Sequence, residues 1–309
     1  MGGASGPFRH RSFDADSGRW DGFPFRDGDI VISTRPRSGT TWTQMICALL
    51  IFQTPDLPAP LGRLSPWLDH LTMPRDEVYA LLARQRHRRF IKTHMPLDAL
   101  PVDRRVTYIV TARQPLDLAV SLYHHTTNID IGRMRELTGN DLPTEPSAAR
   151  KTLRDWLLDW ISHDADPRTN PDSLPGVMRH LGGAWARRGD GNVLLIRYED
   201  LCRDLEGQMR GLADRLGIAV PESAWPTLVR AATFERMRGG ADRYVPGGGI
   251  IKSGTSFFRR GRPGAAEEIL TGEELAAYRA RVASLAAPDL VAWLHAPGGS
   301  GSVRLQDRR

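Results

Sequence analysis

The chain has little lysine and little cysteine. Among its 42 basic residues only Lys92, Lys151 and Lys252 are lysines. Such an arginine bias is more typical of a GC-rich genome than of an anion-binding surface, so the net charge of +6 does not choose among nucleotide, nucleic acid and membrane. The two cysteines, Cys47 and Cys202, exclude a disulfide scaffold. We therefore expect a reducing compartment, the cytoplasm.

Long apolar runs, export signals and metal-ligand spacings are also lacking. The longest apolar run, around residues 45–52, is much too short to span a bilayer. Residues 1–13 contain no apolar core of a signal peptide. The histidines are scattered without ligand spacing, so we expect no metal site. These absences predict a soluble, intracellular protein without a transmembrane segment.

Four short β-branched runs alternate with helical patterns. The runs lie at residues 29–33, 89–93, 106–111 and 192–197. The helical patterns lie at residues 40–52, 76–84, 115–124, 151–160, 201–216 and 273–286. Buried strands that alternate with helices indicate a parallel sheet covered on both faces. The sequence therefore predicts an α/β protein, a three-layer α/β/α fold around a central parallel sheet.

The domain organisation follows from the extent of these patterns. We expect residues 1–25 to form a partly disordered extension, residues 26–296 a single domain, and residues 297–309 a flexible tail. Residues 128–146 and 238–255 are polar or glycine-rich with little periodicity, and we expect both to be mobile loops.

A turn typical of phosphate binding follows the first expected strand. Residues 34–42 read TRPRSGTTW and lead directly into a helical pattern. The first amides of a helix lack internal partners and lie at its positive end, and Gly39 would let the backbone approach an anion. The side chains that add donors are Arg37, Ser38, Thr40 and Thr41. An ordinary strand-to-helix turn is the alternative, but such a turn needs neither two arginines nor a proline.

The loop differs from that of nucleotide triphosphatases. Those loops end in Gly-Lys-Ser/Thr, whereas Gly39 is followed by threonine. The nearest candidate for a magnesium-binding aspartate, Asp200, follows a tyrosine and a glutamate. A magnesium-dependent P-loop kinase for a small molecule remains an alternative on these residues. A non-catalytic nucleotide- or nucleic-acid-binding protein is a second one, although the arginines form no stripe with interleaved aromatics, and we expect no nucleic-acid partner.

Five stretches in order resemble one family. RPRSGTTW resembles the YPKSGTTW loop of the cytosolic-type sulfotransferases. Four further stretches of the family follow, and they are RFIKTHMPLDALP, YIVTARQPLDLAVSLYHH, VLLIRYEDL and SFFRRGRPG. The resemblance implies an enzyme that transfers a sulfuryl group from 3′-phosphoadenosine-5′-phosphosulfate (PAPS) to a hydroxyl or amine by in-line displacement. The desulfated product would be 3′,5′-adenosine bisphosphate (PAP).

The resemblance also assigns the donor-binding residues. Those at the 5′-phosphosulfate are Arg37, Ser38, Gly39, Thr40 and Thr41. Those at the 3′-phosphate are Arg113, Ser121, Arg259, Arg260 and Gly261. Those beside the adenine are Trp42, Tyr198 and Phe234.

Catalysis is expected to depend on His94, Lys92 and Arg37. His94 follows a buried strand at the sheet edge where α/β folds bind ligands, and a neutral imidazole there would take the proton of the acceptor hydroxyl. Such a histidine taken alone is more often a surface residue. The assignment depends on the adjacent Lys92 and on the family resemblance, in which Lys92 and His94 take the matching places. Lysine at position 92 in a chain that otherwise uses arginine indicates that a compact charge is needed. We assign Lys92 and Arg37 to the transferred and leaving oxygens.

The chain departs from the family pattern at three places. Arg37 replaces the usual lysine, and Ala232 stands where a threonine hydroxyl is usual near the adenine. Residues 265–267 read AAE where the family commonly has Asp-Trp-Lys, which predicts looser packing of the closing loop.

The acceptor is less constrained than the donor. SPWLDHL and RRFIKTHMPLDAL are similar to bacterial, actinobacterial-type sulfotransferases, some of them assigned to glycolipids. We expect a small-molecule or lipid acceptor. Candidates for an apolar acceptor pocket, with ordinary core positions as the alternative, are Phe52, Trp67, Leu68, Leu71 and Met73. The oligomeric state is left open.

Overall fold

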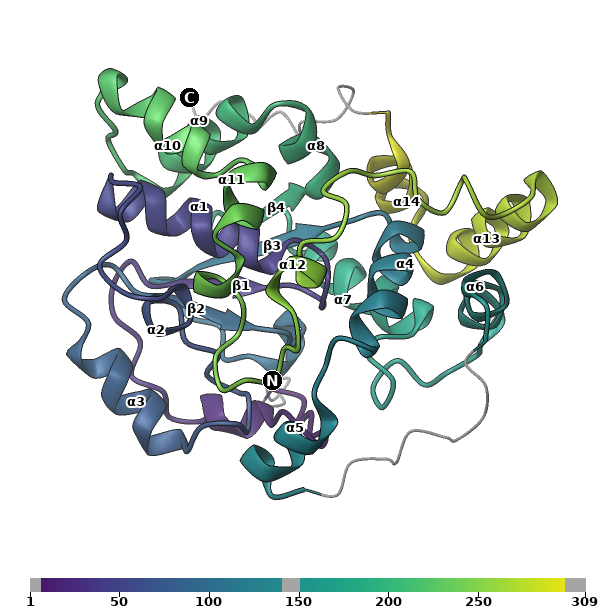
Figure 1. Cartoon of the computed structure of the whole chain (residues 1–309), viewed down its shortest axis with the longest axis horizontal. Coiled ribbons are helices and arrows are strands. Elements are labelled where there is room, and N and C mark those ends of the chain that lie inside the picture. Colours follow the sequence, from purple (N-terminus) through teal and green to yellow (C-terminus); the bar gives the residue numbers. More distant parts are fainter. Residues whose placement is uncertain (1–6, 141–150, 298–309) are drawn as a thin grey trace, which may run out of the picture.

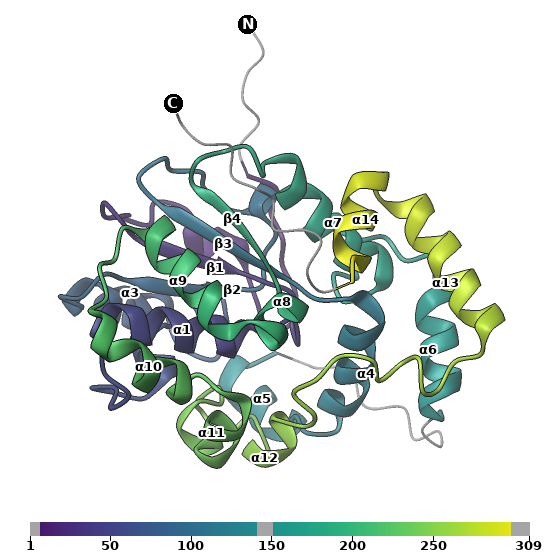
Figure 2. The same cartoon turned by 90° about the horizontal axis from the view of Figure 1, so that it is seen from above.

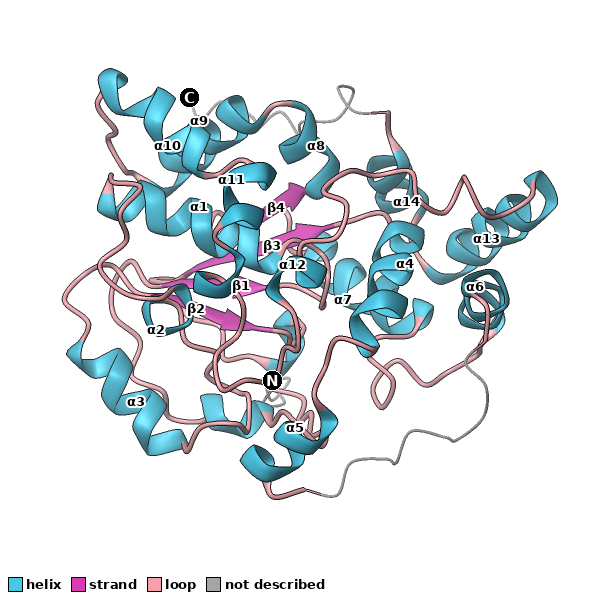
Figure 3. Cartoon of the chain, in the orientation of Figure 1, coloured by secondary structure: helices cyan, strands magenta, loops and turns pink. Residues whose placement is uncertain are grey.

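A sheet of four parallel strands forms the centre of the protein (Figures 1 and 3). The computed structural model describes residues 7–140 and 151–297. The strands are β1 (Ile30–Ser33), β2 (Phe90–Thr93), β3 (Thr107–Ala112) and β4 (Val193–Arg197), in the order β2-β1-β3-β4. Every neighbouring pair is parallel. The four runs that predicted strands are confirmed to within a residue at each end.

Both faces of the sheet are buried, because successive side chains of a strand point to opposite faces. Ile30 and Ile32 of β1 and Phe90 of β2 belong to one apolar cluster. Val31 of β1 and Tyr108 of β3 belong to a second cluster on the opposite face. Two-sided burial explains why the strands read as continuous apolar runs.

Helices cover each face, which confirms the three-layer arrangement (Figure 2). The cluster that contains Ile30 includes side chains from α1 (Thr40–Phe52), α9 (Leu205–Leu216) and α10 (Trp225–Ala231). The cluster that contains Val31 includes side chains from α4 (Pro115–Thr126), α6 (Leu153–Ser162), α7 (Leu174–Ala186), α13 (Gly272–Leu285) and α14 (Pro288–His295).

Shorter elements connect these layers. The α-helices among them are α2 (Leu61–Leu64), α3 (Arg75–Arg84), α5 (Ile131–Thr138), α8 (Tyr198–Arg203), α11 (Phe234–Gly239) and α12 (Gly254–Phe257). The 3₁₀ turns are η1 (Ser17–Trp20), η2 (Leu97–Ala99), η3 (Glu222–Ala224) and η4 (Ala241–Arg243).

The helix predictions need correction in several places, and they omit α10, α11 and α14 altogether. The single helix expected over residues 201–216 is two helices, because Asp204 leaves helical geometry and its side chain caps α9 at the amide of Gly207. The loop expected over residues 128–146 contains α5, whose first turn is capped by Asp130; its end lies outside the described residues. The sequence reading missed α7, although Ser173 caps it and a proline occupies its first turn.

The segment before the first strand packs onto the domain. Trp20 and Phe23 are buried in the same apolar cluster as Val31. The indole Nε1 of Trp20 donates to Asp69 Oδ2 over 2.7 Å. The domain boundary at residue 26 stays a prediction, and the tail expected from residue 297 lies almost wholly outside the described residues.

Within residues 7–140 and 151–297, every helix is too short or too polar to cross a membrane.

Candidate active site

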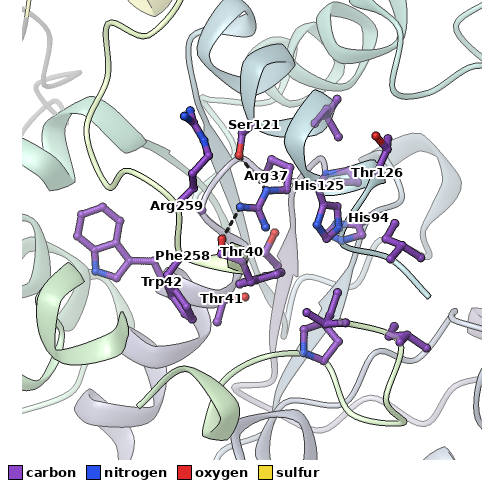
Figure 4. A pocket seen from close by; sticks show the side chains of 18 of the residues that line it. Arg37, Thr40, Thr41, Trp42, His94, Ser121, His125, Thr126, Phe258 and Arg259 are labelled. Carbon is purple, nitrogen blue, oxygen red and sulfur yellow. Dashed lines mark hydrogen bonds between the residues drawn. The ribbon is translucent and has the colours of Figure 1, made fainter. Parts of the chain in front are cut away.

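A cavity of about 490 Å³ lies where the strands end (Figure 4). It is lined by residues that follow each strand in turn: Arg37 after β1, His94 after β2, Arg113 after β3 and Tyr198 after β4. Ligands of open α/β sheets bind at this edge. Every residue assigned to the site from the sequence lines the cavity except Ser38, whose side chain is buried within the loop.

The loop between β1 and α1 has the backbone geometry of an anion site. Gly39 has φ of 102° and directly precedes Thr40, the first residue of α1. No side chain caps this helix end, so its first amides are free to bind an anion. The hydroxyl oxygens of Thr34 and Thr40 lie 2.5 Å apart and tie the two ends of the loop together.

Arg37 spans the middle of the cavity (Figure 4). Its Nε donates to Ser121 Oγ over 2.9 Å, and its Nη2 donates to the carbonyl oxygen of Phe257 over 2.6 Å. Burial, together with the charges of Arg113 and Arg259, lowers the pKa of Arg37 to about 9. None of these three arginines has a carboxylate within 4.0 Å among the described residues. This cluster of positive charge is suited to a polyanion.

Aromatic rings line the end of the cavity near Arg259. Trp42 meets Tyr198 edge to face with ring centroids 5.3 Å apart. The Nε1 of Trp42 donates to the carbonyl oxygen of Ala232 over 2.8 Å. Residue 232, where the family usually has a threonine, therefore fixes the Trp42 ring through its backbone. Gly261 has φ of 69°, and a Cβ there would lie 2.4 Å from Cγ of Phe234. The glycine is therefore required for the close approach of residue 261 to that ring.

The closing segment after Gly261 is anchored to α4. The amides of Gly264 and Ala265 donate to the buried carboxylate of Asp117, each over 2.9 Å. Ala266 is also fully buried. The segment is therefore packed and anchored without a large ring, and the expectation that it is looser than in the family stays a prediction.

Arg260 also lines the cavity, but its guanidinium pairs with Glu268. Nη1 of Arg260 donates to Glu268 Oε2 over 3.0 Å. The charge of Arg260 is therefore already partnered, unlike that of Arg259.

His94 lies on the other side of Arg37 from Trp42 and Arg259 (Figure 4). Its Nδ1 is 2.6 Å from the carbonyl oxygen of Thr34. A carbonyl only accepts, so Nδ1 carries the hydrogen and Nε2 is left as an acceptor. Burial, and then the charges of Lys92 and Arg35, hold the pKa of His94 well below its usual range. The ring is therefore neutral, in the state that can accept a proton.

Lys92 contacts an aromatic ring, and that ring is hydrogen-bonded to a buried acid. Its Nζ lies 3.8 Å from the centroid of Trp67. Trp67 Nε1 donates to Asp69 Oδ1 over 2.7 Å, and Thr93 donates to the other oxygen of that carboxylate. Burial lowers the pKa of Lys92 to about 7, while Asp69 opposes this shift. Burial raises the pKa of Asp69 to about 6.

Sequence reasoning missed Asp69, His70 and His125. Asp69 and His70 lie in SPWLDHL, where an acid within an apolar segment was the available signal. His125 lies beside His94 (Figure 4), and its buried Nδ1 has no hydrogen-bond partner. Burial lowers the pKa of His125 to about 3, so this ring is neutral too.

One end of the cavity is apolar. It is formed where the chain around α5 meets the segment before α12, through an antiparallel bridge between Ile129 and Ile251. The apolar residues that line it are Leu122, Ile129, Ile131, Met134, Ile250, Ile251 and Phe257. Both segments belong to stretches that had been expected to be mobile loops.

The candidates for an acceptor pocket were mostly wrong. Of the five, Trp67 lines the cavity. Leu68 is fully buried in the core, Phe52 packs against the cluster around α1, and Met73 is exposed. Leu71 is absent from the cavity lining. The sequence shows that these side chains are apolar but not which way they point.

In the part of the chain that the structure describes, no group of three or more His, Cys, Asp or Glu side chains could hold a metal ion.

Comparison with known proteins agrees with this geometry. Residues 27–284 match the family described as the sulfotransferase domain. A glycolipid sulfotransferase of Mycobacterium bovis BCG is 40% identical over 306 residues, which cover 93% of each chain. A glycolipid sulfotransferase of Mycobacterium tuberculosis is 40% identical over 305 residues, again 93% of each.

Solved structures share the fold. Retinol dehydratase in complex with androsterone and the inactive cofactor PAP aligns with a TM-score of 0.65 at 23% identity, covering 87% of this chain and 83% of that one. A mouse sulfotransferase complexed with PAP aligns with a TM-score of 0.63 at 22% identity, covering 86% and 87%.

These matches set aside the kinase and non-catalytic alternatives. The chain is an enzyme that transfers sulfuryl groups, and it belongs to the sulfotransferase family.

Proposed function

We propose that the enzyme takes its sulfuryl group from PAPS and transfers it to a hydroxyl of an acceptor with an apolar part, with His94 as general base. The observation that carries this proposal is the state of His94. Its Nδ1 is fixed on the Thr34 carbonyl, and its neutral Nε2 lines the same cavity as Lys92 and Arg37. A general base must be unprotonated and within reach of the acceptor hydroxyl.

The residues present fit a donor that contains adenosine 3′,5′-bisphosphate, as PAPS does. Arg113, Arg259 and Ser121 line the cavity around Arg37, and the two arginines have no carboxylate partner among the described residues. A 3′-phosphate would supply the missing negative charge. The amides at the start of α1 would bind the 5′-phosphosulfate, and Trp42 and Tyr198 would flank the adenine ring. The solved neighbours with this fold contain PAP.

Bound PAPS would supply the sulfuryl group and a phosphate leaving group. Lys92 and Arg37 lie where positive charge can stabilise the negative charge that develops on the transferred and leaving oxygens. An anion beside Lys92 would raise its lowered pKa and favour the charged form. Arg37 cannot give up its proton at physiological pH, so its role is electrostatic rather than acid–base.

The apolar end of the cavity supports a lipid-like acceptor. It presents Ile129, Ile131, Met134, Ile250 and Ile251 to the same cavity as His94. A hydrocarbon chain bound there gains by leaving water, and its hydroxyl can face the imidazole. The mycobacterial relatives are named glycolipid sulfotransferases, which agrees with such an amphiphile.

The test combines ligand stabilisation with sulfuryl transfer. PAP at about 100 times its Kd should stabilise the enzyme by about 2.7 kcal/mol, whereas 5′-AMP should shift Tm much less. Arg259→Met should abolish this preference for PAP. Arg262→Met, an exposed neighbour outside the cavity lining, is the matched control.

Transfer itself is followed with radiolabelled PAPS and 1-octanol or octyl β-D-glucopyranoside as acceptor. Labelled product that depends on His94 would support the proposal. Strong stabilisation by ATP and magnesium but not by PAP would overturn it.

A further inference from the structure

The N-terminal segment forms one wall of the cavity. It runs antiparallel to the SPWLDHL segment, with a bridge between Ala15 and His70. The amide of Leu71 donates to the carbonyl oxygen of Asp14 over 2.7 Å. These backbone bonds place the Asp14 carboxylate beside the His70 ring, and both residues line the cavity.

The same segment also reaches the apolar side of the cavity. Asn140, just beyond α5, donates from Nδ2 to the carbonyl oxygen of Phe13 over 2.6 Å. The Phe13 side chain lines the cavity and is 44% exposed. An aromatic ring therefore lines the cavity next to Asp14 in the chain.

His70 has an unused polar atom in this wall. The residue is only 3% exposed, and its ring stacks on Trp67 with centroids 3.8 Å apart. Nδ1 is paired with Thr72 Oγ1 over 2.7 Å, whereas buried Nε2 has no hydrogen-bond partner. Nε2 lies 3.8 Å from Asp14 Oδ2, too far for a hydrogen bond between them. Buried polar atoms normally have a hydrogen-bond partner, so the unpaired Nε2 of His70 indicates that a ligand supplies one.

Asp172 completes the wall close to the base. One of its oxygens accepts from Arg35, and the same guanidinium donates to the carbonyl oxygen of His94. The Asp172 side chain is 50% exposed and lines the cavity. The ring of Trp67, which stacks on His70, also meets the His94 ring edge to face with centroids 4.5 Å apart. A group bound to this wall would therefore lie near the imidazole that we assign as base.

The chemistry of these groups selects the ligand. Carboxylates only accept hydrogen bonds, and a neutral imidazole has one donor and one acceptor. Several hydroxyls on one rigid ring can satisfy all of them. A cationic amine is disfavoured, because Arg35 already neutralises Asp172 and because Lys92, Arg37 and Arg35 make this part of the cavity positive. The exposed ring of Phe13 offers a face for the C–H surface of a sugar.

We propose that Asp14, His70 and Asp172 form a glycosyl subsite, which binds the sugar hydroxyls of an amphiphilic acceptor while its hydrocarbon part occupies the apolar end. This inference rests on the proposed function and adds to it the part of the acceptor that is recognised beside the reacting hydroxyl.

Direct binding tests the subsite without relying on turnover. The probes are octyl β-D-glucopyranoside below its micelle concentration, 1-octanol and octylamine, which share one alkyl chain. Each is titrated by calorimetry into the PAP-loaded enzyme. We expect the glucoside to bind about tenfold more tightly than octanol, and octylamine no more tightly than octanol.

Two variants should remove the preference for the glucoside. Asp14→Ala deletes the carboxylate, and His70→Phe keeps an aromatic ring against Trp67 but deletes Nε2. Each should weaken the glucoside about tenfold and leave octanol and the Tm shift by PAP unchanged. The matched control is Asp159→Asn on α6, an exposed residue that pairs with Lys151 outside the cavity.

The outcomes separate this subsite from the proposed function. Equal weakening of glucoside and octanol, or no effect of either variant, overturns the subsite. So does a preference for octylamine that Asp14→Ala abolishes, which would indicate an amine site. If the glucoside binds with the expected pattern but no acceptor is sulfated from PAPS, the subsite stands and the proposed function fails.

Discussion

Gly39 lies against the ring of Tyr198, and a Cβ at position 39 would be 3.0 Å from Cδ2 of that tyrosine. The same glycine has φ of 102°, a conformation that residues with a Cβ rarely adopt. Tyr198 follows β4 and Gly39 follows β1, so this contact joins two strand ends at the mouth of the cavity.

Gly39→Ala should therefore destabilise the enzyme by about 1–3 kcal/mol, through backbone strain and the close contact. Binding of PAP should weaken at least tenfold, because the amides after residue 39 would move. Gly211→Ala, in the exposed middle of α9 with free space around it, is the control. It should raise stability by up to about 1 kcal/mol, since alanine favours helix. Urea unfolding and calorimetry measure both effects, and unfolding curves of Gly39→Ala and the parent that coincide would contradict the strain argument.

Replacement of His94 tests the assignment of the base. His94→Gln should lower kcat about 10²–10⁴-fold, because the proton of the acceptor hydroxyl would have no acceptor. The Tm shift caused by PAP should stay within error, since the residue faces the acceptor. His125→Gln, beside it in the cavity, should lower kcat far less. A His94→Gln enzyme with near-normal turnover would rule out a general base at this position.

The lowered pKa of Lys92 predicts proton uptake on donor binding. In the free enzyme burial lowers this pKa to about 7, with Arg37 in the same direction and Asp69 against it. At pH 8 the amine is therefore mostly neutral, and a bound phosphate should restore its proton. Calorimetry of PAP binding in buffers of different ionisation enthalpy should show uptake of up to about one proton. Lys92→Met should abolish that uptake, and uptake that is identical in the two proteins would show that another group titrates.

The same shift has a consequence for stability. The pKa of Lys92 is lower in the folded enzyme than its ordinary value of 10.5, so the unfolded chain binds more protons between about pH 7 and pH 10.5. The contribution of this residue to the free energy of unfolding should therefore rise with pH across that window. Lys92→Met lacks this dependence. Its free energy of unfolding relative to that of the parent, measured by urea unfolding at several pH values, should therefore fall as the pH is raised.

Asp69 is expected to act by positioning Lys92. Its carboxylate accepts from Trp20, Trp67 and Thr93, and Asp69→Asn would place an amide N–H against one of these donors. Stability should fall by about 1–3 kcal/mol. The control is Asp27→Asn, whose side chain is 85% exposed. A merely structural role would leave the proton uptake on PAP binding unchanged, whereas a positioning role should alter its pH dependence.

Local patterns predicted the parts of the protein that depend on local physics. The four strands were readable because burial on both faces leaves β-branched runs, and α1 because its start follows a glycine turn. The residues assigned to the donor come from five separate stretches that resemble the sulfotransferases, and the structure brings all of them except Ser38 to one cavity. The cut between α8 and α9 was missed, because Asp204 reads equally well as a helical residue and as a cap.

The acceptor side could not be found in this way. Its apolar end combines residues near α5 with residues before α12, more than 100 positions apart in the chain, and its polar wall combines Asp14, His70 and Asp172. The loop character of residues 57–73, 123–146 and 238–255 indicates that they surround the acceptor, but no local pattern shows which of their side chains reach the cavity.

By itself the sequence determined the α/β class, the order of the strands along the chain and the glycine turn before α1, because each follows from burial or from the geometry of a few adjacent residues. Only the tertiary structure decided which nitrogen of His94 is free, which arginines have no carboxylate partner and what surrounds the acceptor. Those properties depend on hydrogen bonds and charges between residues far apart in the chain, such as the 60 positions between Thr34 and His94. No local pattern specifies such contacts.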